Sequence, residues 1–290
     1  MIETTISVQG STRETIQGLL RRMLENGTVD AWLVPMRVPG GSVAPMLVKD
    51  PAALAHSDPL APVLPINAAR AASQLTMTAH KEKLGVVMRA CEIRALVELV
   101  KFQQASLDDV LVVGVDCLGT YPVSEYKAAA DRDALADGLR AGAARAEIEP
   151  ADGMAFRDAC TMCEQPIPEG AHVALTIGLV GVEADRVYLK ARDDALLASA
   201  QAPELEAGGT PAGRKDAVKK LVAARTAARD EALAAFRARV GGSGDMQGLL
   251  GEFSACIRCH NCMINCPICY CRECIFRTPT FEHESQLFYQ

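Results

Sequence analysis

Cysteine is the residue type whose spacing points most directly to chemistry, and seven of the eleven cysteines lie within one stretch of nineteen residues. The first four follow the pattern C-x2-C-x2-C-x3-C-P, which is typical of thiolates that bind a 4Fe–4S cluster. Gaps of two residues let one tight loop bring three thiolates to three irons, and the proline ends the loop with a fixed φ. These seven residues are Cys256, Cys259, Cys262, Cys266, Cys269, Cys271 and Cys274. The stretch therefore predicts iron–sulfur chemistry.

The number of clusters in this stretch depends on how the seven thiolates are shared. A cubane takes four thiolates, so seven exceed the need of one cluster and fall one short of the need of two. A second cluster would use Cys269, Cys271 and Cys274 together with one ligand from elsewhere. We favour two clusters, because one cluster would leave three thiols unused. The allocation of the ligands stays open.

Two other uses of clustered cysteines are weaker alternatives. A zinc-bound structural or interaction module also contains C-x2-C pairs, but zinc ribbons need two separated pairs rather than a continuous run. Disulfide bonds are typical of small secreted domains, which a chain of 290 residues does not resemble. His260 lies inside the loop, where we favour a solvated side chain or a hydrogen bond to a cluster sulfur over iron ligation.

The four remaining cysteines form a second candidate site. Cys91 and Cys117 each follow an apolar run, and Cys160 and Cys163 form a lone C-x2-C pair in a polar loop. If the loop closes over the other two residues, the four thiolates supply the number that one cubane needs. The alternative is that Cys91 and Cys117 are small buried hydrophobic residues, a common role of cysteine. The residues alone leave both interpretations open.

The elements that must position this second site are two buried strands. Residues 83–90 and 109–116 are nearly continuous apolar runs, and the first leads into an expected helix over residues 92–103. Apolar runs that alternate with helices are typical of a parallel sheet covered on both faces. Cys91 and Cys117 then lie just past the C-terminal ends of neighbouring strands, at the edge where ligands of open α/β sheets gather.

Other segments of the chain have simpler patterns. Ser11 begins a capping box with Glu14, and a helix with apolar residues at helical spacing follows until Gly27. Pro35 predicts that the strand containing it lies at an edge or is bulged. The further expectations are strands over 31–38 and 43–48, a short helix over 67–78, helical structure over 125–146, a strand over 173–182 with a hairpin partner over 186–190, and a helix over 214–240.

We therefore expect the α/β fold class. A mainly parallel sheet with helices on both faces would be joined to a long Ala-rich helix and a small C-terminal ferredoxin-like iron–sulfur module. The expected domains are an α/β flavin and iron–sulfur domain over 1–200, a linker and helix over 201–244, and the iron–sulfur module over 245–290.

Composition argues against some classes of function and indicates the cellular compartment. The formal net charge is −6 and no basic run occurs, which argues against nucleic acid as a partner. No apolar run reaches the ~18 residues of a transmembrane segment, and no signal peptide is visible. Eleven cysteines without an export signal indicate a reducing cytosol, so we expect a cytoplasmic protein whose thiolates bind metal.

Three segments carry a resemblance to a known family. Residues 84–96, 110–122 and 160–181 resemble the beta-subunit family of coenzyme F-420 reducing hydrogenases, which includes beta subunits of formate dehydrogenases. The resemblance covers roughly residues 10–195 and implies a 4Fe–4S site at Cys91, Cys117, Cys160 and Cys163 beside a flavin. The tail resembles a C-terminal iron–sulfur extension of some bacterial members. The family often has a glycine pair where this chain has Arg13 and Glu14.

The leading hypothesis is an electron-transfer subunit of a larger cytosolic oxidoreductase complex, catalytic only with its partner subunits. It would hold two to three 4Fe–4S clusters, and FAD is implied by the resemblance, since the sequence contains no GxGxxG fingerprint. Partners in the hetero-oligomer would be a catalytic subunit of the formate dehydrogenase or hydrogenase type and a flavoprotein of the heterodisulfide reductase type. The alternative is a stand-alone flavin and iron–sulfur reductase of a deazaflavin or another small substrate.

Overall fold

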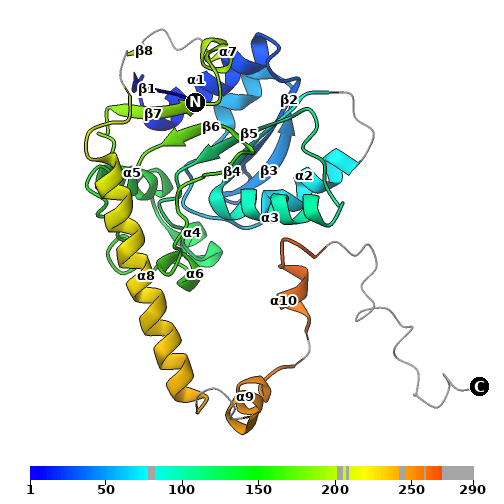
Figure 1. Cartoon of the computed structure of the whole chain (residues 1–290), viewed down its shortest axis with the longest axis vertical. Coiled ribbons are helices and arrows are strands. Elements are labelled where there is room, and N and C mark those ends of the chain that lie inside the picture. Colours follow the sequence, from blue (N-terminus) through cyan, green and yellow to red (C-terminus); the bar gives the residue numbers. More distant parts are fainter. Residues whose placement is uncertain (78–81, 201–204, 207–208, 242–245, 258, 270–290) are drawn as a thin grey trace, which may run out of the picture.

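The structure is a computed structural model that describes residues 1–77, 82–200, 205–206, 209–241, 246–257 and 259–269. Its centre is one mixed β-sheet with helices on both faces (Figure 1). The strands are β1 (Ile2–Ser7), β2 (Ala31–Val38), β3 (Ser42–Val48), β4 (Leu84–Arg89), β5 (Val110–Val115), β6 (Val173–Gly178), β7 (Arg186–Ala191) and β8 (Leu205–Glu206).

The helices lie between and after these strands. They are α1 (Thr12–Glu25), the 3-10 helix η1 (Pro51–His56), α2 (Ala68–Met77), α3 (Ala90–Lys101), α4 (Val123–Ala128), α5 (Arg132–Ala143), α6 (Asp158–Thr161), α7 (Asp194–Ser199), α8 (Arg214–Arg239), α9 (Met246–Phe253) and α10 (Asn261–Ile264). Figure 1 shows α8 leading away from the sheet, α9 following at its far end, and α10 lying back toward α3.

The strand order in the described residues is β3-β2-β4-β5-β6-β7-β1-β8. The four central strands, β2, β4, β5 and β6, pair in parallel, while the outer strands pair antiparallel. The expected parallel sheet is thus confirmed for the centre of the domain, and the predicted hairpin partner is β7. The parallel pairing of β4 with β5 also confirms that the strands preceding Cys91 and Cys117 are neighbours.

Each face of the sheet is covered by its own helices because successive strand residues point to opposite sides. Val87, Val113 and Ile177 belong to a hydrophobic cluster with the buried face of α1. Val86 and Met88 belong to a second cluster with α2 and α3. Full burial of such aliphatic side chains contributes about 1.5–3 kcal/mol each, so these two layers dominate the stability of the domain.

Helix α1 begins at the predicted capping box. The Glu14 amide donates to Ser11 Oγ, and the Ser11 amide donates to the Glu14 carboxylate at 2.8 Å. The helix packs Leu20 against the sheet, where the indole Nε1 of Trp32 donates to the Leu20 carbonyl at 2.9 Å. A Cβ at Gly85 would lie 2.3 Å from the Trp32 ring, so the glycine makes room for the single tryptophan.

Two expectations about local structure were met only in part. The strand that contains Pro35 is not at the edge, since β2 lies between β3 and β4. Its pairing with β4 covers only Ala31 to Leu33, and Pro35 therefore interrupts no hydrogen bond on that side. The helical region over 125–146 is divided into α4 and α5, because Asp131 caps a new helix by accepting from the amides of Asp133 and Ala134.

The segments after the sheet agree only in part with the expected organisation. The long Ala-rich helix is confirmed as α8, and the predicted linker contributes the short strand β8, which pairs with β1. The proposed boundaries at 200 and 244 stay predictions. Only α9, α10 and the turns around them are described in the expected iron–sulfur module, so its ferredoxin-like fold also stays a prediction. Within the described ranges, no helix has the length and apolarity that crossing a membrane requires.

Candidate metal centre

The first two thiols of the candidate site lie at the C-terminal edge of the parallel strands. Strand β4 leads directly into α3, whose second residue is Cys91, and Cys117 follows β5 by two residues. Because β4 and β5 are hydrogen-bonded in parallel from Leu84 to Arg89, their ends are side by side. The sequence prediction for the placement of these two cysteines is therefore confirmed.

The C-x2-C loop is attached to the same edge by backbone hydrogen bonds. The Cys117 amide donates to the carbonyl of Pro166 at 2.8 Å, and the Arg157 amide donates to the carbonyl of Thr120 at 2.9 Å. These two bonds bracket Cys160 and Cys163 on the chain. The hydroxyl of Thr120 also lies 3.0 Å from the Cys160 sulfur. The loop is thus held beside the segment that follows β5.

The four thiols influence one another electrostatically. The charges of Cys117 and Cys163 act on the thiol of Cys91, and the charge of Cys160 acts on that of Cys117. Although Cys91 reaches solvent, desolvation by the surrounding protein atoms, together with Glu92, raises the pKa of its thiol to about 12. Burial likewise raises the pKa of Cys117. Metal binding at these positions must therefore displace thiol protons.

Arg89 places a buried positive charge at this edge. Its guanidinium donates to the carbonyls of Ala61 and Val63, and the residue is 8% exposed. Burial disfavours the charged form of Arg89 and acts to lower its pKa. Nearby acidic groups outweigh this effect and raise the Arg89 pKa; they are Cys117, Glu92, Cys91 and Cys160. A negatively charged group bound by the four cysteines would be compensated by this cation.

The donor chemistry fits an iron–sulfur cluster, because four free thiols share one edge of the sheet with a buried arginine. As the side chains lie, however, no three His, Cys, Asp or Glu side chains of the described residues converge closely enough to hold a metal ion. The assignment of Cys91, Cys117, Cys160 and Cys163 to one cluster therefore stays a prediction.

The tail cysteines are described only in part. Cys256, Cys259 and Cys262 are exposed, and Cys266 and Cys269 are half-buried. Cys271 and Cys274 lie outside the described residues. Ile268 packs against the hydrophobic cluster that α2 and α3 share with the sheet. The loop between Cys266 and Cys269 thus contacts the α/β domain on the face that also carries the helix of Cys91.

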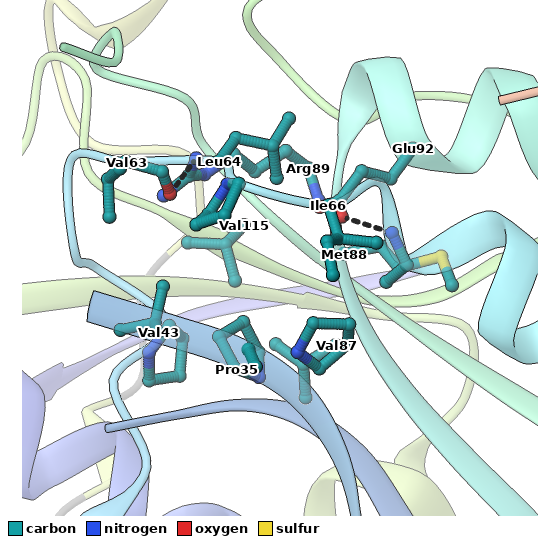
Figure 2. A pocket seen from close by; sticks show the side chains of 15 residues that line it. Pro35, Val43, Val63, Leu64, Ile66, Val87, Met88, Arg89, Glu92 and Val115 are labelled. Atoms are coloured by element: carbon teal, nitrogen blue, oxygen red, sulfur yellow. Dashed lines mark hydrogen bonds between the residues drawn. The ribbon is translucent and has the colours of Figure 1, made fainter. Parts of the chain in front are cut away.

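An apolar pocket adjoins Arg89. It encloses about 20 Å³, which is room for about one water molecule and is well below the volume of small-ligand sites. Figure 2 shows Arg89 and Glu92 across the pocket from Pro35 and Val43. The Glu92 carboxylate accepts from the amides of Ala68 and Arg89, each at 2.9 Å, and its burial raises the Glu92 pKa. The pocket combines apolar walls with one charged corner next to the cysteines.

A larger cleft, of about 670 Å³, lies over β6, β7 and β1 beside the start of α8. Several of its charged groups are paired within the protein. Glu3 accepts from the hydroxyl of Thr210 and lies 3.9 Å from Lys190 Nζ, and the Arg214 guanidinium stacks 4.7 Å from the centre of the Tyr188 ring. None of the nine cysteines in the described residues lines this cleft, and it is therefore separate from the candidate centre.

Sequence reasoning missed the arginines of the site. Arg89 could have been noticed as the one charge that ends the apolar run of β4. Arg225 of α8 is 7% exposed and acts on the Cys117 thiol, but no local pattern separates it from the other arginines of the Ala-rich helix. Asp116, next to Cys117, forms a buried ion pair with Arg214, with Nη1 and Oδ2 2.8 Å apart.

Two curated relatives match most of the α/β domain. The chain is 24% identical over 229 residues to the F420-dependent formate dehydrogenase 1 subunit beta of Methanococcus maripaludis, a match that covers 66% of this chain and 56% of the relative. It is 24% identical over 238 residues to the F420-dependent formate dehydrogenase subunit beta of Methanocaldococcus jannaschii, with coverages of 71% and 59%. The chain thus spans somewhat more than half the length of these relatives.

A solved structure has a similar fold. A chain of the F420-reducing NiFe hydrogenase complex from Methanosarcina barkeri matches with a TM-score of 0.53 at 12% identity, covering 82% of this chain and 92% of that chain. No family model matches the sequence. The matches to the two relatives, together with this shared fold, agree with the resemblance noted in the segments around the early cysteines. The chain is thus similar in sequence to beta subunits of F420-dependent formate dehydrogenases and in fold to a chain of an F420-reducing hydrogenase complex.

Proposed function

We propose that this protein is an iron–sulfur electron-transfer subunit of a larger cytosolic oxidoreductase complex, catalytic only together with its partner subunits. The observation that carries the proposal is the placement of Cys91 and Cys117 at one edge of the sheet, with the C-x2-C loop attached beside them by backbone hydrogen bonds. A 4Fe–4S cluster bound there would supply one-electron transfer. The protein contributes the spacing, the charge compensation and the exclusion of water.

The tail extends the proposed electron path. We propose two further clusters among the seven tail cysteines, and the five described thiols are exposed or half-buried, as ligands presented to a partner would be. The packing of Ile268 against the α2–α3 cluster supports a short path, since it brings the loop of Cys266 and Cys269 onto the same domain as Cys91. Electrons would pass between the tail and the early site.

A flavin is the second proposed cofactor, and the resemblance of the segments around the early cysteines to the beta-subunit family supports it. The pocket beside Arg89 has room for about one water-sized group, so we do not assign the flavin ring to it. The cleft over β6, β7 and β1, at about 670 Å³, has the volume of a small-ligand site. Flavin analysis of the purified protein tests whether the cofactor is bound.

The names of the relatives support a redox complex as the setting. Both matched relatives are formate dehydrogenase beta subunits, and the structural neighbour is part of a hydrogenase complex. We therefore propose a catalytic subunit of the formate dehydrogenase or hydrogenase type as one partner. A flavoprotein of the heterodisulfide reductase type is the proposed second partner. Co-purification of an affinity-tagged chain from its native cells would identify both.

The test of the four-cysteine site is metal analysis of matched variants after anaerobic purification. Cys163→Ser should lower bound iron by about one cubane, or about four irons, and leave the electron paramagnetic resonance (EPR) signals of the tail unchanged. Cys262→Ser, the matched tail variant, should lower iron while it preserves the signal that Cys163→Ser removes. Equal iron in Cys163→Ser and the parent protein would contradict the proposed site. Zinc without iron or acid-labile sulfide would favour the zinc module.

The cleft over β6, β7 and β1 favours a second candidate function, that of a stand-alone flavin and iron–sulfur reductase of a deazaflavin or another small substrate. At about 670 Å³ this cleft is large enough to bind a small substrate. Turnover of a deazaflavin by the isolated chain, with stoichiometric flavin, would support this candidate. Its absence with intact clusters would support the subunit function.

A further inference from the structure

Helix α8 carries one stripe of side chains along the candidate metal centre. Arg214, its first residue, is buried on Asp116, which immediately precedes Cys117. Two turns later Leu221 is buried against Val180 in a separate hydrophobic cluster. Positions four residues apart lie on the same side of a helix, so Arg225 follows Leu221 on this stripe.

The next residue of the stripe reaches the C-x2-C loop. Arg229, four residues after Arg225, forms an ion pair with the carboxylate of Glu164, the residue that follows Cys163. Contacts between α6 and α8 join the same two segments. Arg225 is thus fixed between an anchor beside Cys117 and an anchor beside Cys163, and one turn of helix separates it from each neighbour on the stripe.

Arg225 differs from Arg214 and Arg229, the other two arginines of the stripe, in having no carboxylate partner among the described residues. Arg214 is paired with Asp116, and Arg229 is paired with Glu164 and Asp230. In the described part of the chain no ion pair joins Arg225 to a carboxylate, although the residue is only 7% exposed. Its position on the stripe lies between Arg214, which is paired with the residue before Cys117, and Arg229, which is paired with the residue after Cys163. A buried cation is costly unless an anion compensates it, and the thiolates of the centre are the anions at hand.

We propose that Arg225 is a positioning residue that raises the reduction potential of the centre formed by Cys91, Cys117, Cys160 and Cys163. The inference rests on the proposed function, because it requires a cluster at these cysteines. Reduction adds one electron, taken from a chemical reductant such as dithionite, and therefore one negative charge to the site. A fixed guanidinium stabilises that added charge, and its removal makes reduction less favourable.

The size of the shift in the reduction equilibrium follows from the Coulomb interaction between the Arg225 charge and the electron added to the centre. At an effective dielectric of about 20, a single charge roughly 12 Å from a buried centre changes an equilibrium about tenfold. Arg225→Met should therefore lower the ratio of reduced to oxidised centre about tenfold at a fixed solution potential. For a one-electron couple this corresponds to a midpoint that is about 59 mV lower.

The experiment is a dye-mediated redox titration of the full chain, followed through the EPR signal that Cys163→Ser removes. Arg225→Met should shift this midpoint downward while iron and sulfide stay at the parent level. Arg225→Lys should restore most of the parent potential because it keeps the charge. Arg237→Met is the matched control, since Arg237 is an exposed arginine of the same helix and lies more than three turns beyond Arg225. It should titrate like the parent.

Three results would overturn the inference. One is a parent-like midpoint in Arg225→Met with full iron. Another is an equal shift in Arg225→Lys, and the third is loss of iron in both Arg225 variants, which would show a role in packing rather than in charge. Failure of the proposed function is recognised separately and earlier, because the parent would then lack the EPR signal that Cys163→Ser removes.

Discussion

The buried ion pair of Asp116 and Arg214 allows a quantitative test of how the long helix is joined to the sheet. Arg214 donates from Nη1 at 2.8 Å and from Nη2 at 3.2 Å to the two carboxylate oxygens. The same carboxylate accepts from the amides of Leu179 and Val180 at 2.8 and 3.0 Å. The side chains of Asp116 and Arg214 are 0% and 7% exposed, so neither charge has access to water when its partner is removed.

We predict that Asp116→Asn destabilises the fold by about 3–5 kcal/mol, because it leaves a buried guanidinium without a counter-charge. This loss corresponds to a decrease of roughly two to nearly four powers of ten in the folding constant. Arg214→Met should cost less, since the two amide hydrogen bonds still stabilise the Asp116 carboxylate. The double variant should be more stable than the sum of the two losses implies, because it leaves no uncompensated charge.

The assay is urea unfolding of the four proteins of this double-mutant cycle. Trp32, the single tryptophan, is fully buried, and its fluorescence therefore reports loss of the core. Circular dichroism supplies an independent probe of the same transition. Additive losses in the double variant, or a loss below about 1 kcal/mol in Asp116→Asn, would refute the reasoning that this pair anchors α8 beside Cys117.

Two further predictions concern the loop of the metal centre and the dependence of the free energy of unfolding on pH below 6. Gly114→Ala should lower the amount of iron bound at the early site. The Cβ of the new alanine would lie 2.4 Å from the Pro168 ring and would push away the loop that carries Cys163. Iron content equal to that of the parent protein would contradict this prediction. The hydrogen bonds from Arg37 and Arg13 lower the pKa of the Asp133 carboxyl. Asp133 therefore contributes up to about 1 kcal/mol to the free energy of unfolding above pH ~4, and this contribution is lost as the pH falls below that value. In metal-free protein the stability difference between the parent and Asp133→Asn should therefore shrink from pH 6 to pH 3, and a constant difference would contradict the assignment.

The local signals in the sequence predicted the elements that position the early cysteines. Strand β5 is apolar throughout and β4 is apolar up to Arg89, a pattern typical of strands that are buried on both faces. The capping box at Ser11 likewise defines the start of α1 through hydrogen bonds within four residues. Placement of Cys91 and Cys117 followed from these elements.

The features that could not be predicted depend on contacts between distant segments. Strand β1 pairs with β7 nearly two hundred residues later, and its sequence, Ile2–Ser7, carries no alternation strong enough to indicate this. Pro35 suggested an edge strand because the sequence does not show that β2 leaves β4 after Leu33. The role of Arg225 depends on the direction in which α8 crosses the site, which only the packed structure defines.

The central claim is that the four early thiols hold one cluster, and the most direct measurement isolates that site within the full chain. With all seven tail cysteines replaced by serine, the anaerobically purified and reconstituted protein should bind about four irons and four sulfides and show one EPR signal after reduction with dithionite. Further replacement of Cys117 by serine should abolish this signal. A folded tail-serine protein that binds no iron or sulfide after reconstitution would contradict the account.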